Sequence, residues 1–270
     1  MNATRWLTKG AASPLGQFGR AAYRFVFPPC CPLCHRETES TTREIACQAV
    51  SPVLCDSCIE ELLPPNEARL NRCRRCGMSL GPHIRSDTGC PNCQPRSFCF
   101  DQVVRLGTYE GLLRDACIRG KAPHMQPVSA ALANLLWQVE RGALNEAHAD
   151  LVVPVPRHWT RRVLREHHQA ETLSRVLAQR MGLPHARTLL SKVRLTPDQS
   201  DLTAAQRKQN LQRAFAVRFG QRGISNKTIL LVDDILTTGT TANECARTLK
   251  QAGAKQVVVA VVAVVLPAWR

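Results

Sequence analysis

The sequence is poor in aromatic residues, in acidic residues relative to basic ones, and in long hydrophobic runs. Phe, Trp and Tyr make up 5% of its 270 residues, so stacking on nucleic-acid bases should be a minor interaction. The longest apolar run, residues 257–266, is about half as long as a membrane-spanning helix requires. No charged, apolar and small-residue succession opens the chain, which argues against a secretory signal. We therefore expect a cytoplasmic protein of one or two domains.

The shortage of acidic residues is concentrated in one part of the chain. The whole sequence has a formal net charge of +15, and residues 151–228 contribute +11 of it, from 15 basic and 4 acidic side chains. Such a local excess indicates an anionic partner, such as phosphate, pyrophosphate or nucleic acid. A basic surface that is merely solvated would have the same composition.

Cysteine, in contrast, is unusually frequent. Ten of the thirteen cysteines lie between Cys30 and Cys93, and eight of these form four Cys-x-x-Cys units. A two-residue gap lets a tight turn direct both sulfurs at one ion, and two such units complete a tetrahedral site. Under reducing conditions this pattern favours metal ions over disulfides.

We pair the four units in sequence order, because the gaps within each pair suit a short hairpin. The predicted ligands are Cys31, Cys34, Cys55 and Cys58 for the first Zn²⁺, and Cys73, Cys76, Cys90 and Cys93 for the second. Since each ion would have four protein ligands, both sites are predicted to be structural rather than catalytic. An interleaved pairing and a disulfide framework are the alternatives.

After residues 94–97 the composition changes, and strand-like apolar segments alternate with helical ones. This alternation predicts an α/β domain with a parallel sheet and helices on both of its faces. The expected strands are 98–108, 151–156, 187–194, 214–219, 227–232 and 256–266, and the expected helices are 110–118, 128–140, 167–180 and 240–251.

Two adjacent aspartates, Asp233 and Asp234, follow the apolar segment 229–232. Ligands of an open parallel sheet bind beyond the carboxyl ends of its strands, and ionised carboxylates accept hydrogen bonds, so the neighbouring hydroxyls of a ribose suit this pair. The next segment opens a predicted helix, whose N–H groups and dipole suit a phosphate. That segment consists of Thr237, Thr238, Gly239, Thr240 and Thr241. The order predicts a ribose 5-phosphate site, and an aspartate-rich turn with threonine N-caps is the alternative.

The segment 228–241 resembles the 5-phosphoribosyl 1-pyrophosphate (PRPP) loop of type I phosphoribosyltransferases, whose fold is a parallel sheet with a hood subdomain. The rest of the chain narrows the resemblance to the competence protein F (ComF) family, in the form with an N-terminal double zinc ribbon. The further motifs are YEGLLR at 109–114, VPVP at 153–156, RLTPDQSDL at 194–202, RKQN at 207–210 and AF at 214–215. The chain departs from the family's RGFNQ pattern at Glu166, His167 and His168.

This resemblance implies roles for particular residues. Asp233 and Asp234 would hold the ribose hydroxyls, and residues 237–241 the 5-phosphate. The pyrophosphate loop would contain Pro156 and Arg157, and a flexible loop over residues 192–213 would contain Arg194 and Arg207. Mg²⁺ would accompany PRPP, bound mainly through substrate oxygens.

The resemblance also implies an organisation and a function. Residues 28–96 would form the double zinc ribbon, and residues 97–270 the phosphoribosyltransferase-like domain. The expected role is in natural competence and transformation, in the handling of single-stranded DNA after its uptake, with a competence helicase as a candidate partner. The alternative is an active phosphoribosyltransferase of nucleotide or salvage metabolism, and a PRPP-sensing regulator without catalysis is a third reading. No catalytic residue is assigned, because the sequence shows no recognisable acceptor pocket.

Overall fold

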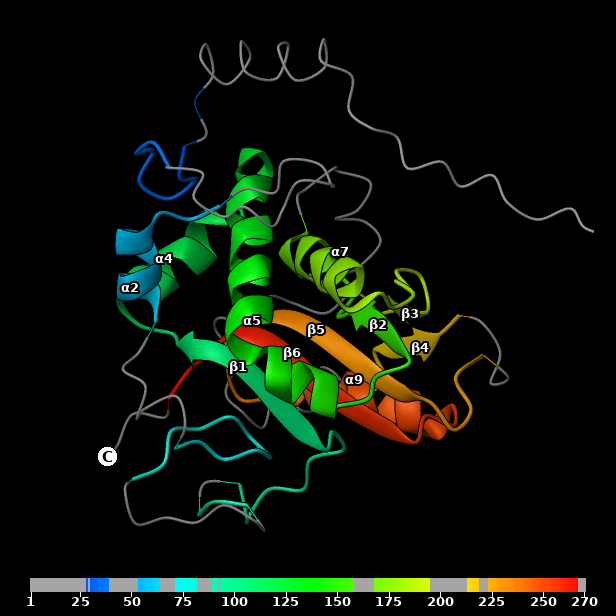
Figure 1. Cartoon of the computed structure of the whole chain (residues 1–270). Helices are drawn as coiled ribbons and strands as arrows, with labels where there is room; N and C mark the ends of the chain where they lie inside the picture. The colour runs from blue at the N-terminus through cyan, green and yellow to red at the C-terminus, as the bar shows by residue number, and fades with distance from the viewer. Residues whose placement is uncertain are drawn as a thin grey trace, which may run out of the picture.

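A four-stranded sheet forms the centre of the computed structural model, which describes residues 28, 30–38, 53–63, 71–81, 89–91, 93–157, 168–194, 213–218 and 223–266. All neighbouring strands are parallel, in the order β1-β6-β5-β2 (Figure 1). The strands are β1 (Gln102–Thr108), β2 (Leu151–Pro154), β5 (Thr228–Leu236) and β6 (Gln256–Val264). The predicted parallel α/β sheet is therefore confirmed.

Helices cover both faces of the sheet, as predicted. They are α2 (Asp56–Leu62), α4 (Gly111–Arg119), the 3₁₀ helix η1 (Pro123–Met125), α5 (Gln126–Glu146), α7 (Gln169–Met181) and α9 (Thr240–Gln251). On one face, the α5/α7 face, α5 packs against β1 and β6, and α7 packs against β2 and β5. On the other, the α9 face, α9 packs against β5, β6 and a small antiparallel sheet of β3 (Leu190–Lys192) and β4 (Phe215–Val217). Within the described ranges, no helix combines the length and apolarity needed to span a membrane.

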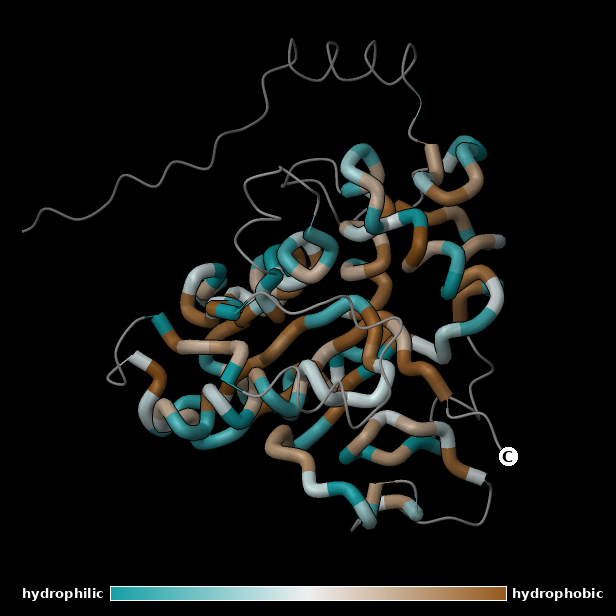
Figure 2. The backbone as a smooth tube through the Cα atoms, turned by 180° about the vertical axis from the view of Figure 1, so that it is seen from behind, coloured by the Kyte–Doolittle hydropathy of each residue, from teal (hydrophilic) through white to brown (hydrophobic). Residues whose placement is uncertain are grey.

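The core has two halves, because successive side chains of a strand point to opposite faces. In β5, Leu230 and Val232 pack with the α5/α7 face, while Ile229 and Leu231 pack with the α9 face. Residues 257–264 of β6 are all buried, as expected for a central parallel strand with apolar cover on both sides. The central strands accordingly form a hydrophobic band in Figure 2.

The two cysteine-rich segments lie on different faces of the sheet, although they are adjacent in sequence (Figure 1). The first comprises residues 30–38 and α2, and lies beside α4, where the Arg119 guanidinium donates to the Leu33 carbonyl at 2.8 Å. The second includes residues 71–81, and is joined to β1 by a 2.8 Å hydrogen bond from the Val103 N–H to the Arg74 carbonyl. Each segment thus completes a different half of the core.

Several elements differ at their ends from the sequence prediction. β1 begins at Gln102 rather than residue 98, because Phe98 and Phe100 stack on each other instead of entering the sheet. β5 continues to Leu236 rather than ending at residue 232, because β6 pairs with it as far as Leu236. The helix predicted at 128–140 extends to Glu146, and the strand predicted at 187–194 is shorter, at Leu190–Lys192. The remaining predicted elements shift only slightly at their ends, and helix 240–251 is confirmed at both ends.

Candidate functional site

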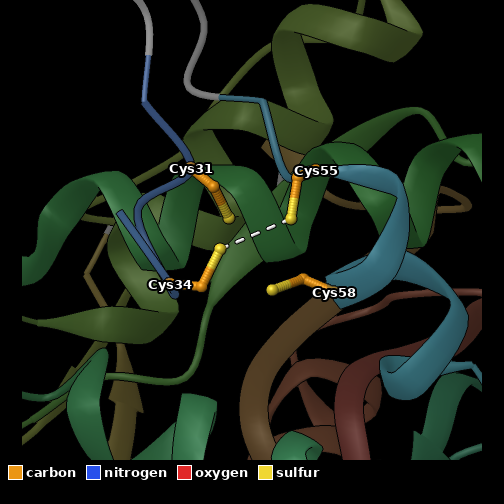
Figure 3. Close-up of side chains that lie close together, drawn as sticks. All are labelled: Cys31, Cys34, Cys55 and Cys58. Carbon is orange, nitrogen blue, oxygen red and sulfur yellow. Dashed lines mark hydrogen bonds between the residues drawn. The ribbon is translucent and has the colours of Figure 1, made fainter. Parts of the chain in front are cut away.

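The first cysteine cluster lies between a turn and the start of a helix. Cys31 and Cys34 flank the turn, while Cys55 precedes α2 and Cys58 lies in its first turn. Their sulfurs point toward one another (Figure 3), with the Sγ atoms of Cys34 and Cys55 3.4 Å apart. All four Sγ atoms lie within 4.8 Å of one another.

The second cluster is formed by two turns and is more deeply buried. Cys73 and Cys76 belong to one turn, and Cys90 and Cys93 to the other. The Sγ–Sγ distances are 3.8 Å from Cys73 to Cys93, 3.5 Å from Cys76 to Cys90 and 3.8 Å from Cys90 to Cys93. All four side chains are buried, whereas Cys34 and Cys55 of the first cluster are partly exposed.

Both clusters fit Zn²⁺. Four sulfurs at about 2.3 Å from a central zinc ion are about 3.8 Å apart in a regular tetrahedron, whereas a disulfide joins two sulfurs at about 2.05 Å. The observed distances match the tetrahedron, and every cysteine among the described residues is a free thiol. The predicted pairing in sequence order is confirmed, and the interleaved pairing and the disulfide framework are not observed.

The electrostatics of the clusters also suit a cation. Burial alone would raise the pKa of the Cys31 thiol, but backbone hydrogen bonds involving Cys34 and Cys55 lower it to about 7. Burial and hydrogen bonds with neighbouring thiols raise the pKa of Cys58, and burial raises that of Cys76. Four crowded thiols resist ionising together, and a bound metal ion removes that resistance by stabilising the thiolates.

The two aspartates lie at the edge of the sheet where the strands end, which we call the carboxyl edge. β2 pairs with β5 only as far as Val232, and β5 then continues through Asp233 and Asp234 beyond the end of β2. The Asp233 carboxylate accepts a 2.9 Å hydrogen bond from the Asp234 N–H, and the Asp234 carboxylate accepts one of the same length from the Ile235 N–H. Burial and the adjacent Asp234 charge raise the pKa of Asp233 well above its usual value.

Two side chains that sequence reasoning did not assign to the site hold Asp234. Lys121, in the turn after α4, places its Nζ 3.5 Å from Asp234 Oδ2. Gln169, the first residue of α7, is 1% exposed. With its amide nitrogen toward Asp234, Gln169 donates to Oδ2 at 3.2 Å and to the Cys117 carbonyl at 3.2 Å.

Gly120 makes this arrangement sterically feasible. A Cβ atom at Gly120 would lie 2.4 Å from the side-chain amide group of Gln169 and 3.0 Å from Oγ of Ser129. Gln169 was visible in the sequence as the last residue of a family motif, but Lys121 belongs to no motif. Only the folded chain brings the turn after α4 to the end of β5.

The threonine segment lies at the same edge and opens α9. Gly239 is the N-cap of α9 with φ +76°, a left-handed conformation that other residues rarely adopt. The hydroxyl oxygens of Thr238 and Thr240 are 2.8 Å apart, and the Asn243 N–H donates to the Gly239 carbonyl at 2.8 Å to close the first turn. The segment therefore begins a 12-residue helix a few residues after the carboxylates, an arrangement that suits an anion beside a diol.

The predicted pyrophosphate loop also begins at the carboxyl edge. The Val155 N–H donates to the Val232 carbonyl at 2.8 Å, so Pro156 and Arg157 follow β2 beside the end of β5. Arg194 is exposed two residues after β3. Arg207 and most of the predicted flexible loop lie outside the described residues, and the roles of these residues stay predictions.

The motif that departs from the family pattern lies just before α7. Glu166 and His167 lie outside the described residues. His168 is the N-cap of α7, and its Nδ1 is 3.8 Å from the Glu171 carboxylate. His168 thus lies at the N-terminal end of α7, one residue before the buried Gln169.

Comparison with known proteins shows similarity over most of the chain. Residues 168–266 match the family described as Phosphoribosyl transferase domain. The chain is 28% identical over 207 residues to Competence protein F of Haemophilus influenzae, covering 76% of this chain and 87% of that protein. It is 30% identical over 196 residues to DNA utilization protein YhgH of Salmonella typhi, covering 70% and 82%. Among solved structures, glutamine PRPP amidotransferase from B. subtilis, complexed with ADP and GMP, overlaps with a TM-score of 0.29 at 22% identity, covering 42% of this chain and 22% of that one.

Proposed function

The chain belongs to the competence protein F family, and from this premise we propose that it binds PRPP or ribose 5-phosphate at the carboxyl edge of its sheet. The observation that carries the proposal is the closeness in sequence and in space of Asp233, Asp234 and the start of α9. Carboxylates that accept hydrogen bonds from a diol, followed by a helix N-terminus that attracts a phosphate, match the two ends of ribose 5-phosphate.

In this proposal each part of the edge has one role. Asp233 and Asp234 accept hydrogen bonds from the ribose hydroxyls, and residues 237–241 hold the 5-phosphate. Pro156 and Arg157 contact pyrophosphate, which arrives with Mg²⁺ bound through its oxygens. Arg194 and Arg207 belong to the loop that would approach the bound ligand. The division into a zinc ribbon at 28–96 and a phosphoribosyltransferase-like domain at 97–270 belongs to the same proposal.

Isothermal titration of the full chain with ribose 5-phosphate, and separately with PRPP and Mg²⁺, tests the site. Asp233→Asn combined with Asp234→Asn should weaken binding by about 1.5–3 kcal/mol for each lost charge-assisted hydrogen bond. Asp115→Asn is the matched control, because Asp115 is exposed on α4. Unchanged affinity in the folded double variant would reduce the aspartates to a structural turn.

We place this binding activity in the use of DNA during competence, in the cytoplasm. The relatives' names support the proposal, as do six exposed cations among the described residues of the basic segment 151–228. They are Arg175, Arg187, Arg194, Arg213, Arg218 and Lys227. Single-stranded DNA is the proposed polymer, and a competence helicase stays a partner predicted from the family resemblance.

Salt dependence tests the DNA proposal. Affinity for a single-stranded oligonucleotide should fall with salt with a slope of about −0.7 per phosphate neutralised, and should vary little with base sequence. Arg175→Ala with Arg218→Ala should reduce that slope, whereas Arg96→Ala with Arg114→Ala, both exposed but outside the segment, should not. Equal effects of the two pairs would contradict binding through residues 151–228.

An active phosphoribosyltransferase is the second candidate function, favoured by the family match of residues 168–266. It predicts release of pyrophosphate from PRPP when a nitrogen nucleophile is supplied. Binding of PRPP without turnover for any tested nucleophile would favour a sensor of PRPP instead.

A further inference from the structure

A short segment between the second cysteine cluster and β1, which we call the link, contacts the start of α9. Residues 94–101 run from Cys93 to the beginning of β1. Within this link, Phe98 and Phe100 stack with ring centroids 4.6 Å apart and an interplanar angle of 19°. Phe100 is 1% exposed and belongs to the same core cluster as Cys90 and Cys93.

The link contacts the threonine segment, residues 237–241, at Gly239, which has a left-handed backbone conformation. A Cβ atom at Gly239 would lie 3.3 Å from Cε1 of Phe98 and 3.7 Å from the ring of Phe100. The two aromatic rings therefore lie directly against the glycine whose left-handed backbone starts α9. A shift of either ring would change the space in which that backbone turns.

A hydrogen bond makes the second connection. The backbone N–H of Cys99, between the two aromatic residues, donates to Oδ1 of Asn243 at 2.6 Å. Asn243 closes the first turn of α9 through its own N–H, which donates to the Gly239 carbonyl at 2.8 Å. The link thus holds both ends of that turn, one by packing and the other by a hydrogen bond.

The first cluster is connected to a different part of the molecule. Its turn receives the hydrogen bond of Arg119 at the Leu33 carbonyl, and its helix α2 packs beside α4. The turn after α4 then reaches Asp234 through Lys121, whose side chain is 44% exposed. This route ends at a carboxylate that Gln169 and a backbone N–H also hold.

We propose that Phe98, Cys99 and Phe100 position the phosphate-binding start of α9, and that the metal ion of the second cluster keeps them in place. This inference rests on the proposed function, since it assigns the 5-phosphate to residues 237–241. Without the metal ion the link would lose its anchor at Cys93. If the start of α9 then adopts its binding conformation only a tenth of the time, apparent affinity falls about tenfold.

The test compares variants of the two clusters in the full chain. Cys93→Ser removes a ligand of the second cluster, and Cys55→Ser removes one of the first. Cys93→Ser should weaken ribose 5-phosphate binding by about tenfold or more and raise hydrogen–deuterium exchange at residues 239–243 without ligand, whereas Cys55→Ser should weaken binding by under about threefold. Equal affinities and equal exchange in the two variants would overturn the inference.

Phe98→Ala decides the question if Cys93→Ser does not fold, because it leaves all eight predicted ligands in place. It should retain both zinc ions, yet raise exchange at residues 239–243 and weaken ribose 5-phosphate binding. Wild-type exchange at these residues in Phe98→Ala would overturn the inference. If the wild type itself fails to bind ribose 5-phosphate, the proposed function fails, and exchange without ligand still decides whether the link positions α9.

Discussion

The two cysteine clusters have the same ligand pattern but different surroundings. The first is partly exposed and lies beside α4 on the α5/α7 face. The second is wholly buried on the other face, and residues 94–101, which follow it, contact the start of α9. Sequence spacing sets the geometry within each cluster, whereas the core that each one joins decides which part of the carboxyl edge it supports. Two zinc sites of one type can thus have different consequences for one ligand site.

Loss of metal should have the largest effect and should distinguish the two clusters. Metal analysis should return two Zn²⁺ per chain, one for each four-cysteine group. Release to a chelator should have two phases, because the partly exposed first cluster is more accessible than the buried second one. Cys55→Ser should remove the fast phase and Cys93→Ser the slow one, each with a loss of thermal stability, since structural zinc binding contributes folding free energy.

Cys245→Ser is the control for that experiment. Cys245 is buried in α9 outside both clusters, so this variant should retain two Zn²⁺ and both release phases. A single release phase whose amplitude either cluster variant halves would mean that the clusters do not differ in accessibility.

Gly120→Ala should have the next largest effect, and it acts on the α5/α7 face. The new Cβ would lie 2.4 Å from the side-chain amide of Gln169, so that side chain would have to leave Asp234. We expect a loss of about 1–3 kcal/mol in the free energy of unfolding, measured by denaturant titration. Gly142→Ala, in α5 with open space around the glycine, should instead stabilise by about 0.4–1 kcal/mol.

Asp233→Asn should stabilise the protein in a pH-dependent way. The raised pKa of Asp233 means that the native state binds its proton more tightly than the unfolded state does. The free energy of unfolding of the wild type therefore falls as the pH rises from the unfolded-state pKa of Asp233 toward its raised native-state pKa. The variant lacks this loss. The Tm advantage of Asp233→Asn over the wild type should grow as the pH rises above about 4, the usual pKa of an aspartate. A constant difference would contradict the raised pKa.

Lys121→Met should have the smallest effect. Lys121 is partly exposed, so its ion pair with Asp234 should contribute about 0.2–1 kcal/mol to stability, less at high salt. Lys121→Arg should restore most of this contribution. A loss as large as that of Gly120→Ala would show that Lys121, rather than Gln169, chiefly holds Asp234.

Patterns that repeat at short range made much of the fold predictable. The helix at 240–251 is confirmed at both ends, and the apolar run of β6 correctly predicted a central strand buried on both faces. The spacing of the cysteines predicted both four-cysteine groups. Hydrophobic periodicity and two-residue gaps are local properties, and tertiary packing did not override them here.

Features that depend on long-range packing were not predictable. The continuation of β5 through both aspartates requires pairing with β6, which apolarity alone does not show. The contact of Phe98 with Gly239 joins residues far apart in sequence, and so does that of Lys121 with Asp234. The placement of two adjacent cysteine segments on opposite faces has no sequence signal either, because both carry the same motif.

Hydrogen–deuterium exchange of the full chain, with and without ribose 5-phosphate, tests the central claim most directly. The claim predicts protection of the backbone N–H groups at the end of β5 and the start of α9, over residues 233–243. Binding with protection confined to other segments would contradict it, and so would the absence of any change at saturating ligand.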